Sequence, residues 1–516
     1  MKKIIILSLF LAIAGCVTIS YPTVFQEILQ AAGDNSLELK KAINYFQNKG
    51  NFLELSSLYF LLENIEGHHY FEFGLFDAQN NQIEWHIEDY ASYQKAKAAM
   101  DSLENQYGKL HWDKAKKIED VQAISSQYLI NNVELAYQAW KNKPWAQQFP
   151  YQSFQEYILP YRVNNEPIGN WRQFFLKEYQ DLPQKLENPE DMIEAATYIN
   201  EKLKSWVKFD SKYYLHPTDQ SFMQMLRSGK GRCEDMSTFA IYAMRANGIC
   251  VAADYTPYWA DSNNNHVWNA LITLDGKTIP FMGCEVNPGE YELAHKVAKV
   301  YRKSFRKQQQ NLAFQQNNAD RIPPWLGSKF SRDVTPFYTK VNDIVVKLDT
   351  LKYPQPENSR FLFLAVFNNG AWRPIDWAEI EQNSAEFIDM GLEIMYLPCY
   401  YNRKVIPAGP PFILQKNGKQ YVLDGKKAKN LSITFTAVDK AKFTSPSDSL
   451  YFEGEEGKYE LFFWHKKWIS LGKKTTTGQA LHFSNIPANR IYRLTKTNDI
   501  GNERIFSFKN EKQIWW

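Results

Sequence analysis

The alternation of apolar and polar positions changes character along the chain. Up to about residue 150 it predicts helices with charged outer faces. A further helix is predicted to begin at Asn188, because Pro189 suits the first helical position and apolar residues then recur at helical spacing. After about residue 330, short alternating segments separated by turns such as Asn417-Gly418 predict strands. The pattern therefore predicts an α+β protein with a helical N-terminal region and C-terminal β-sandwich-like domains.

These changes also place the expected domain boundaries in the 516-residue chain. A stretch rich in glutamine and asparagine, which ends in Pro323-Pro324, marks the main boundary. The expected segments are a signal peptide at 1–15, a helical domain at 16–150, a central α+β domain at 151–305, a linker at 306–330, a β-rich domain at 331–430 and a β-sandwich-like domain at 431–516.

The N-terminus has the features of an export signal. Lys2 and Lys3 precede a short apolar run that is typical of a signal peptide and too short for a membrane span. The run ends in Ala14-Gly15-Cys16, which resembles a bacterial lipobox, whose cysteine becomes lipid-modified. We therefore expect a protein of the bacterial cell envelope, anchored at Cys16 to the outer membrane by lipid alone. An ordinary signal peptide with an incidental cysteine is the alternative.

Composition excludes several other classes of protein. Sixty basic and fifty-seven acidic residues give a net charge of +3 without a basic stripe, so no nucleic-acid partner is expected. Five cysteines are too few for a disulfide scaffold, and none has the spacing of a metal site. We expect no metal and no other cofactor. At least one cysteine is then either a buried apolar residue or a reagent.

Cys233 is the best candidate for such a reagent. It follows the flexible segment Gly229-Lys230-Gly231-Arg232 and stands where a helix is predicted to start, with Asp235 as its cap or buttress. The predicted helix is amphipathic, with apolar residues at Met236, Phe239, Ala240, Ala243 and Met244. Because a helix N-terminus presents free N–H groups and the positive end of the dipole, we expect the pKa of this thiol to be lowered.

His266 begins a predicted strand that lies two elements further along the chain. The segment from His266 to Ile272 alternates, and Asp275-Gly276 forms a hairpin turn into the next strand. We expect His266 to meet Cys233 across the packing of helix on sheet. It would take the proton of the thiol and later protonate a leaving amine. Trp268 is expected to form a wall of the cleft.

The order of these motifs resembles the transglutaminase-like superfamily. Gly231-Arg232-Cys233 matches a Gly-x-Cys at a helix start, and His266-Val267-Trp268 matches a His-x-Trp on a later strand, within about residues 186–305. More loosely, the whole chain is similar to large transglutaminase-like lipoproteins of the Bacteroides group. The resemblance implies a papain-like Cys-His-Asp site that acts on protein or peptide amides through a thioester. Cys233 would be the nucleophile and His266 the base.

The third member of the implied triad departs from the family pattern. The place usually taken by Asp holds Met282, which cannot orient an imidazole. An unbroken hairpin would pair Leu274 with Lys277 and bring Glu285 opposite His266, so Glu285 is one candidate. Asn287 is the other.

Two functions of different classes follow from these residues. The first is an envelope enzyme that hydrolyses amides or transfers their acyl group to an amine. The second is a catalytically inactive member of the fold, which binds a protein, a glycan or another envelope partner.

Overall fold

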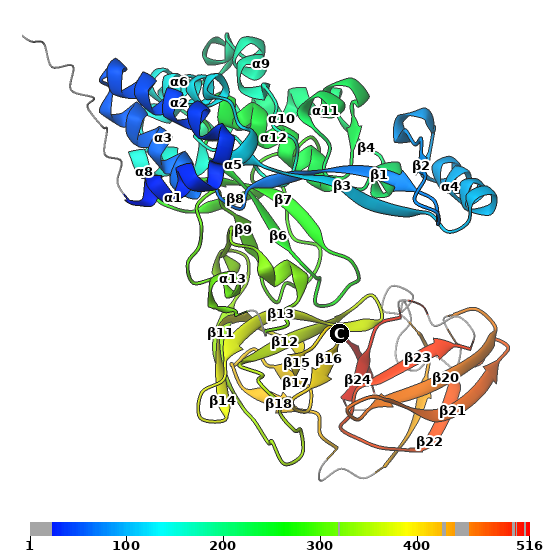
Figure 1. The fold of residues 1–516 in the computed structure, drawn as a ribbon. Coiled ribbons are helices and arrows are strands. Elements are labelled where there is room, and N and C mark those ends of the chain that lie inside the picture. The colour runs from blue at the N-terminus through cyan, green and yellow to red at the C-terminus, as the bar shows by residue number, and fades with distance from the viewer. Residues whose placement is uncertain are drawn as a thin grey trace, which may run out of the picture.

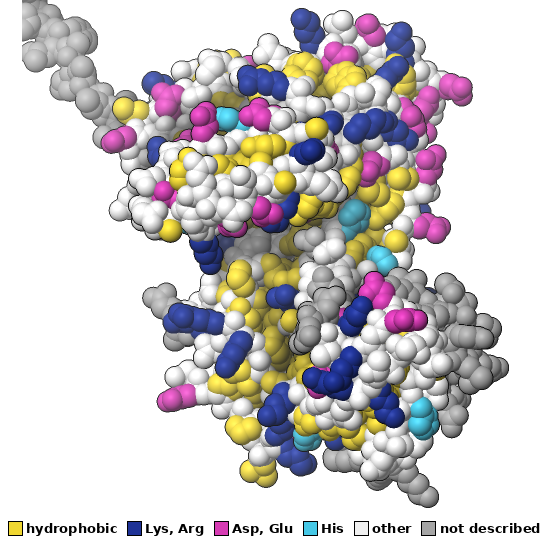
Figure 2. All heavy atoms as spheres, turned by 90° about the vertical axis from the view of Figure 1, so that its right-hand side faces the viewer, with side chains coloured by type: hydrophobic (Ala, Val, Ile, Leu, Met, Phe, Trp, Pro, Cys, Tyr) yellow, Lys and Arg dark blue, Asp and Glu magenta, His cyan; other side chains and the backbone are white. Residues whose placement is uncertain are grey.

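The computed structural model describes residues 23–516, apart from 318–319, 426–429, 439–451, 453, 498–500, 502 and 510–511. The predicted signal peptide and Cys16 therefore lie outside the described residues. Figure 1 shows a helical body at the top, a sheet below it and two β domains at the bottom. Figure 2 shows a waist between the helical half and the β half, with exposed hydrophobic side chains along it.

The N-terminal region consists of short helices and one long antiparallel ribbon. Asn51 caps α3 by accepting hydrogen bonds from the N–H groups of Leu53 and Glu54. The helices are α1 (Thr23–Ala32), α2 (Ser36–Lys49), α3 (Phe52–Asn64), α4 (Tyr93–Tyr107), α5 (Asp120–Ala123), α6 (Ser126–Asn142), α7 (Pro144–Gln147) and α8 (Tyr151–Tyr157). The ribbon strands are β1 (His69–Phe76), β2 (Gln82–Ile83) and β3 (His111–Glu119). Figure 1 shows this ribbon reaching out from the helical body, with α4 beyond its far end.

The central domain packs helices against a five-stranded antiparallel sheet of order β10-β9-β6-β7-β8. The helices are α9 (Trp171–Glu178), α10 (Met192–Trp206), α11 (Phe222–Ser228) and α12 (Cys233–Ala246), and the strands are β6 (Val251–Thr256), β7 (His266–Ile272), β8 (Thr278–Phe281), β9 (Tyr301–Lys303) and β10 (Ser331–Asp333). Helix α10 begins at Met192 and not at Asn188, because the Asp191 side chain accepts the first free N–H groups. Helix α12 is buried from Asp235 to its end.

One hydrophobic core runs through the N-terminal and central segments. Its buried members extend from Phe25 to Phe305 and include Trp145, Trp171 and Phe239. The same core continues across residue 150, so the expected boundary there does not separate two cores. The two segments pack as one body.

The C-terminal half contains two β sandwiches. In the first, β11 (Val341–Lys347) and β14 (Ser384–Gly391) pack on a sheet of β12 (Phe361–Asn368), β13 (Ala371–Glu379), β15 (Ile394–Tyr401), β16 (Val405–Pro407), β17 (Phe412–Leu414) and β18 (Gln420–Val422). In the second, β19 (Leu431–Phe435) and β22 (Leu481–Ile486) pack on β20 (Gly457–Trp464), β21 (Trp468–Thr476), β23 (Tyr492–Lys496), β24 (Phe506–Lys509) and β25 (Lys512–Trp515). The predicted fold class is confirmed.

The expected linker at 306–330 is packed and not free. Leu312 on the short helix α13 (Leu312–Gln315) and Leu326 are buried in a core that also contains Phe361 and Leu397 of the first sandwich. This segment therefore attaches the central domain to the β half. Within the described residues no helix combines the length and apolarity that a bilayer crossing would need.

Candidate active site

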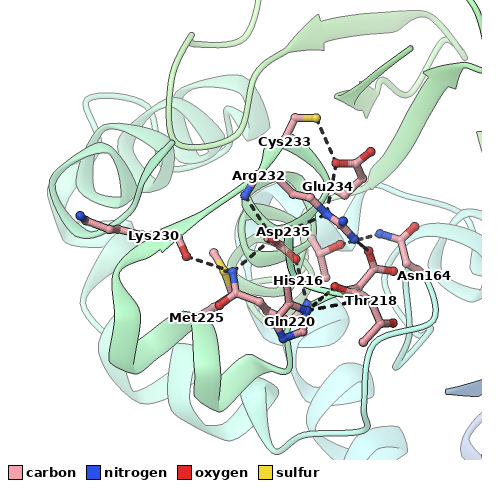
Figure 3. A network of polar contacts seen from close by, with 12 residues as sticks. Asn164, His216, Thr218, Gln220, Met225, Lys230, Arg232, Cys233, Glu234 and Asp235 are labelled. Carbon is pink, nitrogen blue, oxygen red and sulfur yellow. Dashed lines mark hydrogen bonds and ion pairs between the residues drawn. The ribbon is translucent and has the colours of Figure 1, made fainter. Parts of the chain in front are cut away.

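Cys233 is the first residue of α12, and the turn before it is tightly held. The Asp235 carboxylate accepts hydrogen bonds from the backbone N–H of Arg232 at 3.1 Å and of Gln220 at 2.9 Å (Figure 3). A Cβ on Gly231 would lie 2.7 Å from the Cβ of Asp235, so only glycine fits there. The predicted helix start and the predicted buttressing role of Asp235 are confirmed.

Asn269 sets the position of β7 relative to α12. Its amide nitrogen donates to the carbonyl of Ser237 at 3.0 Å, and its amide oxygen accepts from the N–H of Gly283 at 2.9 Å. A Cβ on Gly283 would lie 2.5 Å from the Cβ of Ala240, so the turn after β8 lies directly against the helix. One buried side chain thereby joins the Cys233 helix, the His266 strand and the turn that follows β8.

The pKa of Cys233 is raised, whereas its place at a helix start predicted a lowered pKa. Burial is the largest cause, and the Glu234 carboxylate adds to it through its charge and through a hydrogen bond from Sγ at 3.1 Å. Together they raise the pKa to about 12. Backbone hydrogen bonds from Glu234 and Val267 favour the thiolate but have smaller effects. At neutral pH the thiol is therefore protonated.

The contact with Val267 brings Cys233 next to His266. The N–H of Val267 belongs to the peptide bond that follows His266, the first residue of β7. The sulfur of Cys233 therefore lies at the end of β7 at which the imidazole stands. Cys233 begins α12 and His266 begins β7, so each residue starts the kind of element that the sequence predicts for it.

Aromatic rings surround the imidazole of His266. Its centroid lies 5.9 Å from the ring of Trp259, 5.8 Å from that of Trp268 and 6.2 Å from that of Tyr291. Burial lowers the pKa of His266, the charge of Glu234 raises it by a smaller amount, and His295 lowers it. Trp268 is fully buried and packs beneath the imidazole. It therefore does not line an open cleft, in contrast to the prediction.

Neither predicted third member reaches the imidazole of His266. Strand β8 pairs Ile272 with Thr278 and ends at Phe281, so the register is one residue away from the predicted pairing of Leu274 with Lys277. Met282 then bridges to Val286 in a tight turn, which leaves Glu285 on the turn and exposed. The shortened β8 is the physical reason that the extrapolated pairing of His266 with Glu285 does not form.

Asn287, the other candidate, is engaged elsewhere. Its oxygen accepts from the Asn200 side chain at 3.2 Å, and its nitrogen donates to Glu201, both on α10. Its amide therefore ties the loop after β8 to α10 and does not orient His266. Within the described residues, no hydrogen bond reaches the ring nitrogens of His266 from either candidate.

Residues 180–281 match the family model described as the transglutaminase-like superfamily. The central domain is transglutaminase-like. A candidate cysteine protease from Cytophaga hutchinsonii is 20% identical with a TM-score of 0.18, and the match covers 22% of this chain and 37% of that chain. The transglutaminase of red sea bream is 9% identical with a TM-score of 0.19, and the match covers 86% of this chain and 76% of that chain. No curated protein matches the chain.

The transglutaminase-like domain contains one functional candidate that the sequence reading missed. Glu234 is the carboxylate whose charge acts on both Cys233 and His266. The guanidinium of Arg232 lies 3.6 Å from the same carboxylate and 3.0 Å from Asp219. The only local signal was the acidic Glu234 directly after the cysteine. An acidic residue in the first helical turn is normally explained by its interaction with the helix dipole, so this signal did not indicate a role at the site.

Two tyrosines complete the surroundings of the thiol. Burial raises the pKa of Tyr214 to about 12, with smaller effects from the charge of Cys233 and a hydrogen bond to it. Burial likewise raises the pKa of Tyr291 to about 12, again with an effect of Cys233. Tyr214 belongs to a 3-10 turn, Ser211–Leu215, in which the amino group of Lys212 donates to the carbonyl of Tyr90 at 2.7 Å. The N-terminal region therefore supports one side of the site.

The β half supports the other side. The amide nitrogen of Asn368 donates to the carbonyls of Trp259, Ser262 and Asn264 at 2.9–3.0 Å. The buried guanidinium of Arg504, in the second sandwich, donates to the carbonyls of Ala260 and Ser262. These contacts hold the loop that connects β6 to His266, so residues more than 100 positions away determine its conformation.

Among the described residues, the other three cysteines pack in hydrophobic cores, and no group of side chains forms a metal site. Cys250, Cys284 and Cys399 are buried and unpaired, as is expected of small apolar core residues. No cluster of three or more His, Cys, Asp or Glu side chains with metal-binding geometry occurs in this part of the chain.

Proposed function

We propose that this chain is a cell-envelope lipoprotein whose transglutaminase-like site breaks amide bonds of proteins or peptides through a thioester on Cys233. The observation that carries the proposal is the juxtaposition of a helix-terminal thiol with the first peptide bond of the His266 strand. The tyrosine, tryptophan and glutamate side chains around this pair give it a partly enclosed environment.

The protonation states support catalysis by a neutral pair of groups. Burial lowers the pKa of His266 and raises that of Cys233, so the imidazole and the thiol are both uncharged before reaction. His266 would remove the thiol proton while sulfur attacks the amide carbonyl carbon. The C–N bond then breaks, and the imidazolium protonates the departing amine.

The second half of the reaction releases the acyl group. Water, or a second amine, loses a proton to His266 and attacks the thioester carbonyl carbon. The C–S bond then breaks, and the imidazolium returns the proton to the sulfur of Cys233. Water gives hydrolysis and an amine gives transamidation. The charge of Glu234 would stabilise the imidazolium in both halves, which is the electrostatic part of the task that a triad Asp performs.

The experiment is a comparison of acceptors. The whole chain is incubated with a mixture of casein peptides, with and without glycine ethyl ester, and the products are analysed by mass spectrometry. New peptide termini or deamidated glutamines show transfer to water, and ester adducts show transfer to the amine. Products that persist unchanged in the Cys233→Ala variant would refute the proposal.

The envelope location is supported by the basic start, the short apolar run and the Ala14-Gly15-Cys16 motif. Two or more acyl chains on Cys16 would hold the protein at a membrane without a spanning helix. In a bacterial host, Cys16→Ala should release the protein from the outer-membrane fraction, and mass spectrometry should detect acylated Cys16 in the unchanged chain. An unmodified Cys16 in membrane-bound protein would refute this location.

A catalytically inactive binding protein is the second candidate. It is favoured by Met282 at the usual Asp position and by the hydrogen bond of the thiol to Glu234, which stabilises the unreactive form. Under this candidate, a protein or glycan retained from envelope extracts would bind the Cys233→Ala variant as tightly as the unchanged chain. The same extracts would contain no product of amide cleavage.

A further inference from the structure

A groove between the two β sandwiches has the size and walls of a ligand site. It lies between β18 and the β24–β25 hairpin, and it has a cavity volume of about 730 Å³. Strands β18 and β25 are the outermost strands of their sheets. The two sandwiches are joined beside the groove, because Asn489 donates to the carbonyl of Val422 at 3.2 Å and accepts from the N–H of Gly425 at 3.1 Å. The groove is thus built by the fold.

Aromatic rings line both sides of this groove. Tyr421 of β18 is 48% exposed and lines the groove together with Trp515 and Trp516, which are partly exposed. Trp516 is held in place, because its indole N–H donates to the hydroxyl of Ser507 and its backbone carbonyl accepts from Arg504, both at 2.9 Å. Rigid, partly exposed rings of this kind offer flat apolar faces at little cost in conformational entropy.

The described lining of the groove also carries more positive than negative charge. It includes Lys296, Lys416 and Lys509 against the single acidic residue Glu393. The amino group of Lys296 lies 6.0 Å from the ring centre of Trp516 and donates to the backbone carbonyl of Glu393. Lys416 and Lys509 form no ion pair with any other described residue. Lys296 therefore places a cation near an aromatic ring of the groove, and Lys416 and Lys509 line the same groove.

We propose that this groove binds an acidic oligosaccharide, such as a chain of uronic acids. The C–H face of a sugar ring would stack on Trp516 or Tyr421, and its carboxylates would pair with the lysines. A peptide added as an extra strand fits less well, since β18 has three residues and β25 four. The site is separate from Cys233 and does not depend on its chemistry.

The test measures binding to the whole chain by isothermal titration calorimetry and by tryptophan fluorescence. The probes are tetrasaccharides of galacturonic, mannuronic and glucuronic acid, with cellotetraose as the neutral sugar. A tetraglutamate peptide and an oligothymidylate serve as other anions. Binding of at least one acidic sugar is expected, at least about tenfold tighter than cellotetraose, and weakened by salt.

Variants locate the site by replacing exposed side chains, which limits the risk of unfolding. Lys416→Ala/Lys509→Ala and, separately, Tyr421→Ala should each weaken binding of the acidic sugar by about tenfold. The matched control is Lys419→Ala/Lys467→Ala, which removes the same charge from exposed positions outside the groove and should leave binding unchanged. The proposal is overturned if no acidic sugar binds or if the groove variants bind normally. Equal affinity for cellotetraose, or tighter binding of the peptide or the oligothymidylate, also overturns it.

Discussion

The polar side chains near the two ends of α12 differ in how fully their hydrogen-bonding groups are satisfied. Near the C-terminal end of the helix, Arg245 donates to the backbone carbonyl of Arg162 at 2.9 Å. The Arg162 side chain in turn donates two hydrogen bonds to the carboxylate of the buried Asp120, at 2.8 and 2.5 Å, and Tyr161 donates a third at 3.0 Å. At the start of the helix, the thiol of Cys233 has one carboxylate partner, and the imidazole of His266 is enclosed by rings and not by acceptors. The first arrangement maintains a single conformation. The second arrangement leaves the imidazole nitrogens of His266 available to form hydrogen bonds with another molecule.

The largest expected effect falls on the chemistry of the second region. Cys233→Ala should lower the rate of amide cleavage by at least about 10⁴-fold, because no other group at the site can form the thioester. Thermal unfolding should stay close to that of the unchanged chain, since Cys233 is only partly buried. Cys399→Ala, which removes a buried thiol from the β half, is the control that keeps full activity. If Cys233→Ala retained its turnover, Cys233 could not be the nucleophile.

The next largest effect falls on the first region. Arg162→Met should lower the free energy of unfolding by about 3–5 kcal/mol, because the Asp120 carboxylate would remain buried without its partner. Urea denaturation followed by circular dichroism measures this. Lys277→Met, in an exposed ion pair with Asp275, should cost less than about 1 kcal/mol. Equal costs at the two positions would show that burial does not distinguish these ion pairs.

A smaller effect should reach the site from the β half. Asn368→Ala removes three hydrogen bonds to the loop before His266, so hydrogen exchange in residues 257–265 should become faster. We expect amide cleavage to fall by about tenfold through a lower kcat, while the alkylation rate of Cys233 stays unchanged. Asn402→Ala, an exposed position on the same sandwich, is the control. Unaltered exchange in the loop would contradict the proposed coupling.

The smallest effect concerns the pH dependence of the thiol. Glu234→Gln removes a negative charge that raises the pKa of Cys233, so that pKa should fall. Alkylation by iodoacetamide should then rise at lower pH than in the unchanged chain, and it should be several-fold faster at pH 8. Glu285→Gln tests the alternative carboxylate and should leave the profile in place. If the pH profile shifted in Glu285→Gln and not in Glu234→Gln, Glu285 would be the carboxylate that raises the pKa of Cys233.

Sequence patterns around Cys233 and His266 predicted the helix and the strand of the site, but they could not predict its contacts with distant segments. The start of the helix could be predicted from the glycine just before Cys233 and the amphipathic residues just after it. The strand could be predicted from the alternation that begins at His266, so each element has its signal within a few residues of its own start. The register of β8 could not be predicted, because it depends on how Gly283 packs against Ala240 in the folded chain. Asn368 and Arg504 gave no signal at all, since their contacts with the β6–β7 loop form only in the folded chain.

The sequence by itself determined which residues start the helix and the strand, and hence where a thiol and an imidazole stand. Only the tertiary structure decided their protonation states and partners. A helix terminus lowers the pKa of a thiol by a short-range effect of its own backbone, but burial by Tyr214, Tyr291 and the sheet, together with the turn of the Glu234 carboxylate toward Sγ, outweighs it. Desolvation depends on atoms from several elements at once, and no single stretch of sequence contains that information.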